Sequence, residues 1–296
     1  MTSRLLGRLS QLNIINCRTI YTTNNLSAFH EIDKKSSYPR ISDYQEEKKT
    51  ILQRMKLGYS QLKQEMSLFQ EELIDKFYMD PISAFRQGEV DVKWKFNGDP
   101  ELLKKWVVTC DSDYNEGFSK ATFEYTPQGS ALFSGILDTR LPRDGKQKGA
   151  GYCNIRSTLP RKAFGRAEPM DWGMYTHLIM RIRGDGRNYM LNLTLDNYYD
   201  VTWNDIHGFV LYTRGGPYWQ YVKIPFSKFF LSNRGRIQDS QAPIRLNMIN
   251  HVGVTCGDDI CGPFSLEIDY IGLERDQRFM EEFAYEMYRP PNPYYI

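Results

Sequence analysis

The stretch LIMRIRGDGRNYMLNLTL, residues 178–195, decides the fold class of this chain. Apolar side chains occupy every second position on both sides of a glycine-rich turn at 184–188: Leu178, Met180 and Ile182 before it, then Tyr189, Leu191, Leu193 and Leu195. A period of two places successive side chains on opposite faces of a strand. We therefore predict an antiparallel hairpin with one buried face. Because similar segments recur from 172 to 273, we predict an all-β fold.

Other alternating segments extend this prediction along the chain. We expect strands at 90–96, 121–125, 131–137, 203–209, 219–224, 252–254 and 264–271. Residues 230–243, which contain a short run of arginine and glycine, are expected to form a loop. With 296 residues the chain is long enough for one sizeable β domain with extensions, which we place at 88–275.

Three ordered motifs carry a resemblance to a known family. MRIRGDGRNYMLNL (180–193), YWQYVKIPFSKF (218–229) and GPFSLEIDYIGL (262–273) resemble the complex I intermediate-associated protein family, assembly factors of mitochondrial NADH:ubiquinone oxidoreductase. Weaker similarity lies in ALFSGIL (131–137) and GAGYCNIRS (149–157), so the resemblance spans roughly residues 115–275. In place of a Gly-Gly-x-Ser turn this chain has EGFS at 116–119, so we expect that loop to differ in shape.

The resemblance implies a jelly-roll β-sandwich of the galactose-binding-domain-like type. It also implies a non-enzymatic assembly factor, a chaperone or scaffold that holds membrane-arm intermediates of complex I in the mitochondrial matrix at the inner membrane. The implied partners are those intermediates and a scaffold containing ECSIT, an acyl-CoA dehydrogenase relative and membrane-embedded assembly factors. Membrane association would be peripheral and through these partners, with no cofactor, metal or nucleic acid.

The first residues are typical of a mitochondrial transit peptide. Arg4, Arg8 and Arg18 occur with no acidic residue before Glu31, and four leucines of residues 5–12 fall on one helical face. We assign residues 1–22 to the transit peptide and 23–41 to a polar linker; a disordered tail is the alternative. No stretch reaches the ~20 apolar residues that a membrane-spanning helix needs, and the net charge of +2 argues against a general basic field for nucleic acid.

Residues 42–80 are predicted to form one amphipathic helix, ended by Asp80-Pro81. Apolar residues follow one another at steps of four and three, while charged residues, among them Glu71 and Glu72, are expected to solvate the other faces. The apolar stripe must be buried, either against the chain's own sandwich or against a partner helix. Both interpretations stay open. The stripe comprises Met55, Tyr59, Leu62, Met66, Phe69, Leu73 and Phe77.

Residues 276–296 are predicted to form a short helix and an apolar tail. Phe279, Phe283 and Met287 lie four residues apart, and Pro290 ends the helix. The segment is expected either to cap the chain's own sandwich or to anchor a partner. This segment and the 42–80 helix supply our candidates for partner binding: Met55, Leu62, Met66, Phe69, Leu73, Phe77, Phe283, Tyr294 and Tyr295.

No motif predicts a catalytic or metal site. Asp111, Asp113 and Asn115 have the spacing of a calcium loop, but Glu116 and Thr122 stand where such a loop needs Gly and Glu, so only a looser calcium site stays open. The paired glycines of 149–151 and 184–186 lack the third glycine of a dinucleotide-binding loop. The cysteines, Cys17, Cys110, Cys153, Cys256 and Cys261, are expected to be free thiols, a Cys256–Cys261 bond being the alternative.

An aromatic cluster supports a second functional hypothesis. Its rings could stack on sugar faces, which would make the domain a carbohydrate-binding module, or they could simply pack in the core. The cluster comprises Trp172, Tyr175, Tyr198, Tyr199, Trp203, Tyr212, Tyr218 and Trp219.

Overall fold

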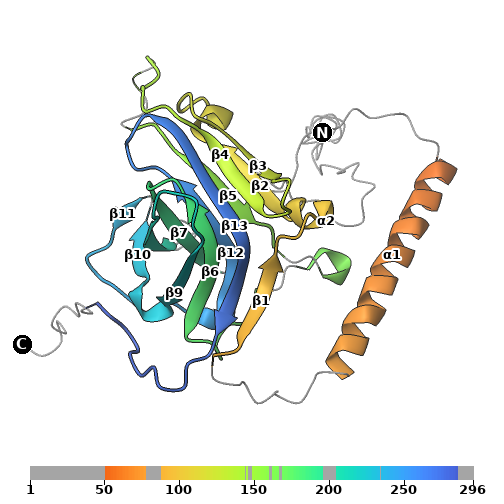
Figure 1. Ribbon diagram of the computed structural model, residues 1–296. Coiled ribbons are helices and arrows are strands. Elements are labelled where there is room, and N and C mark those ends of the chain that lie inside the picture. The colour runs from red at the N-terminus through yellow and green to blue at the C-terminus, as the bar shows by residue number, and fades with distance from the viewer. Residues whose placement is uncertain are drawn as a thin grey trace, which may run out of the picture.

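Two antiparallel sheets packed face to face form the body of the protein, and a long helix, α1 (Ile51–Phe77), lies beside them (Figure 1). The computed structural model describes residues 51–77, 88–143, 145, 149–159, 162–166, 169–195, 205–233 and 235–285. The predicted all-β sandwich with an N-terminal helix is confirmed. The predicted transit peptide, the linker, and residues 286–296 lie outside the described residues. No helix within the described ranges is long and apolar enough to cross a membrane.

The first sheet is organised around one long strand, β13 (Gly262–Glu274). Its first part pairs with β4, its last part pairs with β1 on the same edge, and β6 runs along its other edge. The other strands, in order across the sheet, are β3 (Lys120–Tyr125), β4 (Ala131–Leu137) and, beyond β13, β6 (His177–Gly184) and β9 (Gln220–Pro225); β1 is Val90–Lys95.

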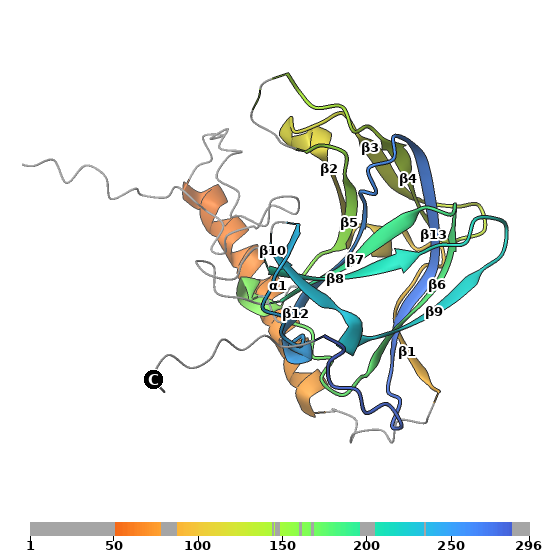
Figure 2. The same cartoon turned by 90° about the vertical axis from the view of Figure 1, so that its left-hand side faces the viewer.

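The second sheet packs its inner face against the first (Figure 2). Across it lie β11 (Arg236–Ile237), β10 (Phe230–Asn233), β8 (Asp205–Tyr212), β7 (Asn188–Leu195), β12 (Ile249–Cys256), β5 (Cys153–Ser157) and β2 (Trp106–Cys110). Short helical turns connect the strands: α2 (Pro100–Leu103), η1 (Asp111–Tyr114), η2 (Ala163–Gly165), η3 (Phe226–Lys228) and η4 (Leu246–Met248).

The predicted hairpin at 178–195 is wrong in its pairing. β6 pairs with β13 and β9, whereas β7 pairs with β12 and β8, so the turn at 184–188 carries the chain from one sheet to the other. Both apolar runs are fully buried, and stacking them face to face across the core buries them as well as a hairpin would. A period of two is the same in either arrangement. The turn is tight: a Cβ on Gly184 would lie 2.4 Å from Cβ of Thr213.

Other predictions have mixed outcomes. The strands expected at 121–125, 131–137, 219–224 and 264–271 are present, but β2 and β5 were not expected, and the expected loop at 230–243 contains β10 and β11. The expected C-terminal helix is also wrong as far as residue 285, because 276–285 follows turns and bends across the sandwich. Phe279 packs on His177 with ring centroids 4.6 Å apart, and the backbone N–H of Ala284 donates to Ser227 O at 3.1 Å. These contacts replace helical hydrogen bonds.

The calcium-like motif is instead a buried staple. Asp111 is fully buried, and its carboxylate accepts hydrogen bonds from Ser119 N (2.8 Å), Ser119 Oγ (3.0 Å) and Gly151 N (2.8 Å). A Cβ on Gly117 would lie 2.0 Å from Asp111 Oδ2, so the loop closes over the carboxylate only with glycine there. Asp111 therefore joins the 111–119 loop to the start of β5, and its oxygens are occupied by these donors.

Replacing Asp111 tests this staple. Asp111→Ala leaves buried donors without an acceptor at about 1–3 kcal/mol each, so we expect the free energy of unfolding to fall by about 3 kcal/mol or more. Urea denaturation of the full chain measures the loss. Asp239→Ala, which removes a carboxylate from an exposed position, is the matched control and should change stability by less than about 0.5 kcal/mol. Equal losses in the two variants would contradict the assignment.

Candidate functional site

Helix α1 is attached to the sandwich domain through carboxylates that accept hydrogen bonds from the turn η2. Glu65 Oε2 accepts from the backbone N–H of Phe164 at 2.7 Å. Glu72 accepts from the backbone N–H of Ala163 and from the guanidinium of Arg166. In Figure 1 the green coil of η2 lies between α1 and the sheets. We call Glu65, Glu72 and the 163–166 turn the α1 clamp.

The clamp stabilises a strained turn. Phe164 has φ 60° and ψ 30°, a left-handed conformation that costs a non-glycine residue about 1–2 kcal/mol. The two carboxylates satisfy the N–H groups at this bend, and the ring of Phe69 lies 5.8 Å from that of Phe164, centroid to centroid. Glu65 is only 5% exposed. The turn and the helix therefore support each other, and neither has these partners alone.

The acidity of Glu72 reflects these contacts. The hydrogen bond from the Ala163 N–H lowers the pKa of Glu72 below its ordinary value, and the Arg166 guanidinium lowers it further. A carboxyl whose folded-state pKa is depressed stabilises the folded arrangement above its unfolded pKa and loses that contribution as pH falls through the folded pKa. The clamp is thus complete at neutral pH.

An apolar face of α1 adjoins the clamp and is exposed. Five members of the predicted stripe have side chains that are 41% to 86% exposed, and from here on the apolar stripe means these five: Tyr59, Leu62, Met66, Leu73 and Phe77. At about 100° per residue, this stripe is centred roughly a quarter turn from Glu65 and Glu72. The helix therefore turns Glu65, Glu72 and Phe69 to its own domain and leaves the apolar stripe outside. Of the two sequence interpretations, packing of the whole stripe on the sandwich does not occur.

The nine partner-binding candidates fall into separate groups. Leu62, Met66, Leu73 and Phe77 share the exposed stripe, whereas Phe69 is half-buried against Phe164. Met55 lies in the first turns of α1. Phe283, in the C-terminal segment, is half-buried, and its ring centroid lies 5.6 Å from that of Tyr285. Tyr294 and Tyr295 lie outside the described residues.

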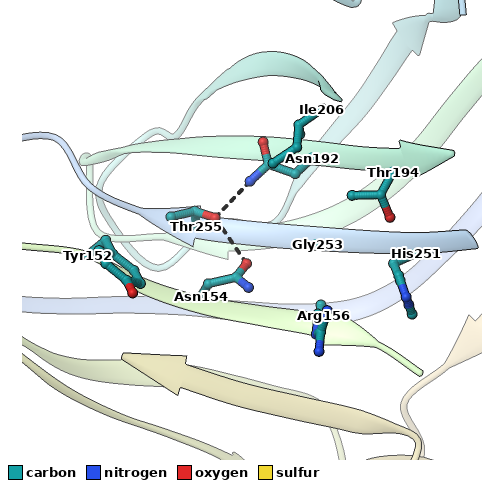
Figure 3. Close-up of a pocket in the computed structure, with 9 residues that line it drawn as sticks. All are labelled: Tyr152, Asn154, Arg156, Asn192, Thr194, Ile206, His251, Gly253 and Thr255. Atoms are coloured by element: carbon teal, nitrogen blue, oxygen red, sulfur yellow. Dashed lines mark hydrogen bonds between the residues drawn. The ribbon is translucent and has the colours of Figure 1, made fainter. Parts of the chain in front are cut away.

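A groove of about 240 Å³, lined mostly by residues with polar side chains, lies on the outer face of the second sheet. Figure 3 shows its lining side chains rising from β5, β7 and β12, with the two asparagines turned toward one threonine. Asn192 Nδ2 donates to Thr255 Oγ1 at 2.8 Å, and Thr255 Oγ1 donates to Asn154 Oδ1 at 3.0 Å. The lining residues are Tyr152, Asn154, Arg156, Asn192, Thr194, Ile206, His251, Gly253 and Thr255.

The groove has the chemistry of a hydrogen-bonding surface. His251 Nδ1 lies 2.7 Å from Ser157 O, and because a carbonyl only accepts, Nδ1 carries the hydrogen. Burial, with a smaller contribution from Arg156, lowers the pKa of His251 to about 4, so the imidazole is neutral at pH 7. The hydroxyl of Thr255 is engaged on both sides by amides. This arrangement can bind polar groups.

The described members of the aromatic cluster do not converge on this groove. Trp172 is 1% exposed in the core, and Trp219 lies under Arg181 and Arg183, whose guanidinium carbons are 4.9 and 5.1 Å from its ring centroid. Tyr212 and Tyr218 are exposed elsewhere, and residues 198, 199 and 203 lie outside the described part of the chain. Tyr152 is the one aromatic residue among the nine that line the groove.

Sequence reasoning missed the residues that hold α1. Glu72 was expected to lie on a solvated face of the helix, and no role was predicted for Glu65. Both accept hydrogen bonds from backbone N–H groups more than 90 positions away. No helical pattern distinguishes a solvated glutamate from one that caps a distant turn. The groove was missed because polar residues at alternating strand positions are usually a solvated face.

Comparison with known proteins gives one strong family match. The family model described as complex I intermediate-associated protein 30 matches residues 94–268. The Drosophila melanogaster protein named complex I intermediate-associated protein 30, mitochondrial, is 47% identical over 274 residues, covering 92% of this chain and 91% of the fly protein. The Mus musculus protein of the same name is 42% identical over 214 residues, which cover 72% of this chain and 65% of the mouse protein.

Solved structures are more distant. Two structures of a family 11 carbohydrate-binding module from Clostridium thermocellum have TM-scores of 0.43 and 0.45, at 16% and 14% identity. They cover 63% and 67% of this chain, and 96% and 100% of the module.

Replacing the side chain of Glu72 tests the clamp. Because most of the stability of a helix in a protein comes from its tertiary contacts, Glu72→Ala should loosen α1 and speed amide hydrogen exchange in residues 51–77 by at least about tenfold. Exchange in β6, β7 and β13 should be unaffected. Glu71→Ala is the control, because Glu71 is the exposed neighbour and carries the same charge. Equal exchange in the two variants would show that Glu72 does not hold the helix.

Acid should release the same helix. Since the folded-state pKa of Glu72 is lowered from 4.5, protonation below that value removes the stabilisation by the clamp. We expect protection factors of α1, corrected for intrinsic exchange, to be constant from pH 7 to about pH 5 and to fall at lower pH. In Glu72→Ala the fall should be smaller. A wild-type profile parallel to that of the variant would contradict this origin.

Proposed function

Because this chain belongs to the complex I intermediate-associated protein 30 family, we propose that it is a mitochondrial assembly factor for respiratory complex I. Relatives from fly and mouse that cover most of the chain carry that family's name and the word mitochondrial. The matched region, 94–268, runs from β1 into β13 and so includes nearly the whole sandwich.

The exposed apolar stripe of α1 is the observation that carries a mechanism. An assembly factor must cover apolar surface on an incomplete complex and give it up when the permanent neighbour arrives. A single helical stripe is small compared with obligate interfaces, which favours a reversible contact. The clamp holds α1 on the domain while its apolar face remains available. We propose that this face binds assembly intermediates of complex I in the helix-in-groove manner.

Finer parts of the proposal rest on the family resemblance. We propose that the bound species are membrane-arm intermediates, met in the matrix at the inner membrane within a scaffold containing ECSIT, an acyl-CoA dehydrogenase relative and membrane-embedded factors. Residues 1–22 would direct import. Phe283, Tyr294 and Tyr295 would extend the docking surface from the other end of the chain. We propose that the role is scaffolding without catalysis.

A carbohydrate-binding role has no specific observation in its favour. It was motivated by the aromatic cluster, and the described members of that cluster lie in the core or away from the groove. We therefore do not propose it.

A pair of charges introduced on the stripe tests the proposal. Leu62→Glu with Met66→Glu places two carboxylates where the partner would bury apolar side chains. Burying one such apolar side chain contributes about 1.5–3 kcal/mol to the free energy of binding. Because about 1.4 kcal/mol is tenfold in affinity, we expect recovery of complex I subunits with the tagged protein from mitochondria to fall at least about tenfold. Native gels with mass spectrometry of the purified fractions measure the recovery.

The control carries the same charge on another face of the same helix. Ser60→Glu with Gln64→Glu also places two glutamates four residues apart at exposed positions, away from both the stripe and the clamp. It should leave recovery unchanged. Loss in both variants would point to the helix charge rather than the stripe, and full recovery with the stripe variant would remove α1 from the interface. Absence of complex I subunits from the wild-type sample would defeat the assembly role itself.

A further inference from the structure

Three cysteines lie side by side across the second sheet. Cys153 of β5 is the register partner of Cys110 on β2 and also of Cys256 on β12. All three side chains face the core, with exposures of 5% for Cys110 and 0% for the other two. The sequence shows no motif here, because the residues are separated by 43 and 103 positions.

The hydrogen-bond pattern distinguishes the two neighbouring pairs. One position further along β2 and β5, the backbone N–H of Asp111 donates to Tyr152 O at 3.2 Å. Hydrogen-bonded and non-hydrogen-bonded pairs alternate along an antiparallel ladder, so Cys110 and Cys153 occupy a non-hydrogen-bonded pair. Such pairs have Cα atoms ~4.5 Å apart and the closer side chains, a separation within the range that disulfides span. Cys153 and Cys256, on the opposite side of β5, form the wider pair.

The chemistry of the thiols agrees with this geometry. The hydrogen bond between the two thiols lowers the pKa of Cys110 and raises that of Cys153, so Cys110 is the better thiolate. Burial raises the pKa of Cys256 to about 12. Cys110 also ends β2, the edge strand of its sheet.

We propose that Cys110 and Cys153 form an oxidation site that a peroxide converts to a cross-strand disulfide. The Cys110 thiolate attacks one peroxide oxygen, the O–O bond breaks, and a sulfenic acid and hydroxide form. Cys153 then attacks the sulfenic sulfur, an S–S bond forms, and the hydroxyl leaves as water with the Cys153 proton. With hydrogen peroxide, two thiols and one oxidant give one disulfide and two waters.

The bond would fasten the edge strand β2 to β5. Within its sheet β2 pairs with β5. Closing the chain between Cys110 and Cys153 encloses β3 and β4 in one covalent loop. The alternative pairing suggested by the sequence joins Cys256 and Cys261, which lie at different sheets. Cys256 ends β12 inside the core, whereas Cys261 is exposed next to the start of β13 in the other sheet.

Mass mapping of the full chain tests the assignment. The Cys17→Ser, Cys261→Ser background removes the exposed thiol and the one in the predicted transit peptide. After treatment with hydrogen peroxide, acid quenching, alkylation and proteolysis, we expect a reductant-sensitive link between the peptides of Cys110 and Cys153. The Tm should rise by roughly 5 °C or more on oxidation. Adding Cys256→Ser should preserve both effects, and adding Cys110→Ala should abolish both.

Several results would overturn the proposal. A Cys153–Cys256 link would reassign the pair, and both thiols still open to alkylation after unfolding would show that no bond forms. Sulfinic acid on Cys110 without a link would show that Cys153 does not resolve it. If Cys110→Ala fails to fold, the peptide link and the Tm shift in the parent background decide the matter without it.

Discussion

The need to bury two apolar strand faces at once governs this structure. The alternating runs of β6 and β7 are joined by a short turn, yet they lie in different sheets and cover one another across the core. This stacking excludes water from both runs and contributes on the order of 25 cal/mol for each Å² of apolar surface buried. It requires a connection that crosses between sheets, which explains the close approach of Gly184 to Thr213. In the first sheet, β13 is long enough for β4 and β1 to pair one after the other along the same edge.

The contacts that hold α1 come from the turn η2, which lies outside the two sheets. The helix is attached by polar contacts, Glu65 and Glu72 meeting the N–H groups of a bend that Phe164 strains. Such contacts are weaker than core packing and depend on the charge of the carboxylates. They leave the apolar stripe outside, where a partner can cover it. The same helix is thus attached to its domain through Glu65 and Glu72 and leaves its apolar stripe available to a partner.

Strand β5 shows how one ladder can serve two surfaces. Its outward side chains, among them Asn154, meet Thr255 and Asn192 in the groove, while its inward side chain at Cys153 meets Cys110 and Cys256 in the core. Alternation places these two sets on opposite faces. Substitutions on β5 therefore separate cleanly: those at even positions of this strand affect the groove, and those at odd positions affect the core.

The sequence by itself determined the class of the fold, most of the strands, the long N-terminal helix with its apolar stripe, and the family, because these depend on periodicity and on motifs that are local. Only the tertiary structure decided that 178–195 bridges two sheets, that Glu72 holds a distant turn, that Phe69 is covered while Leu62 and Met66 are not, and that three scattered cysteines form a row. The reason is physical. A period of two shows that a strand has a buried face. The strand that covers that face lies tens of residues away in the sequence. Burial requires this covering strand to be apolar, but it does not specify which apolar segment takes that place.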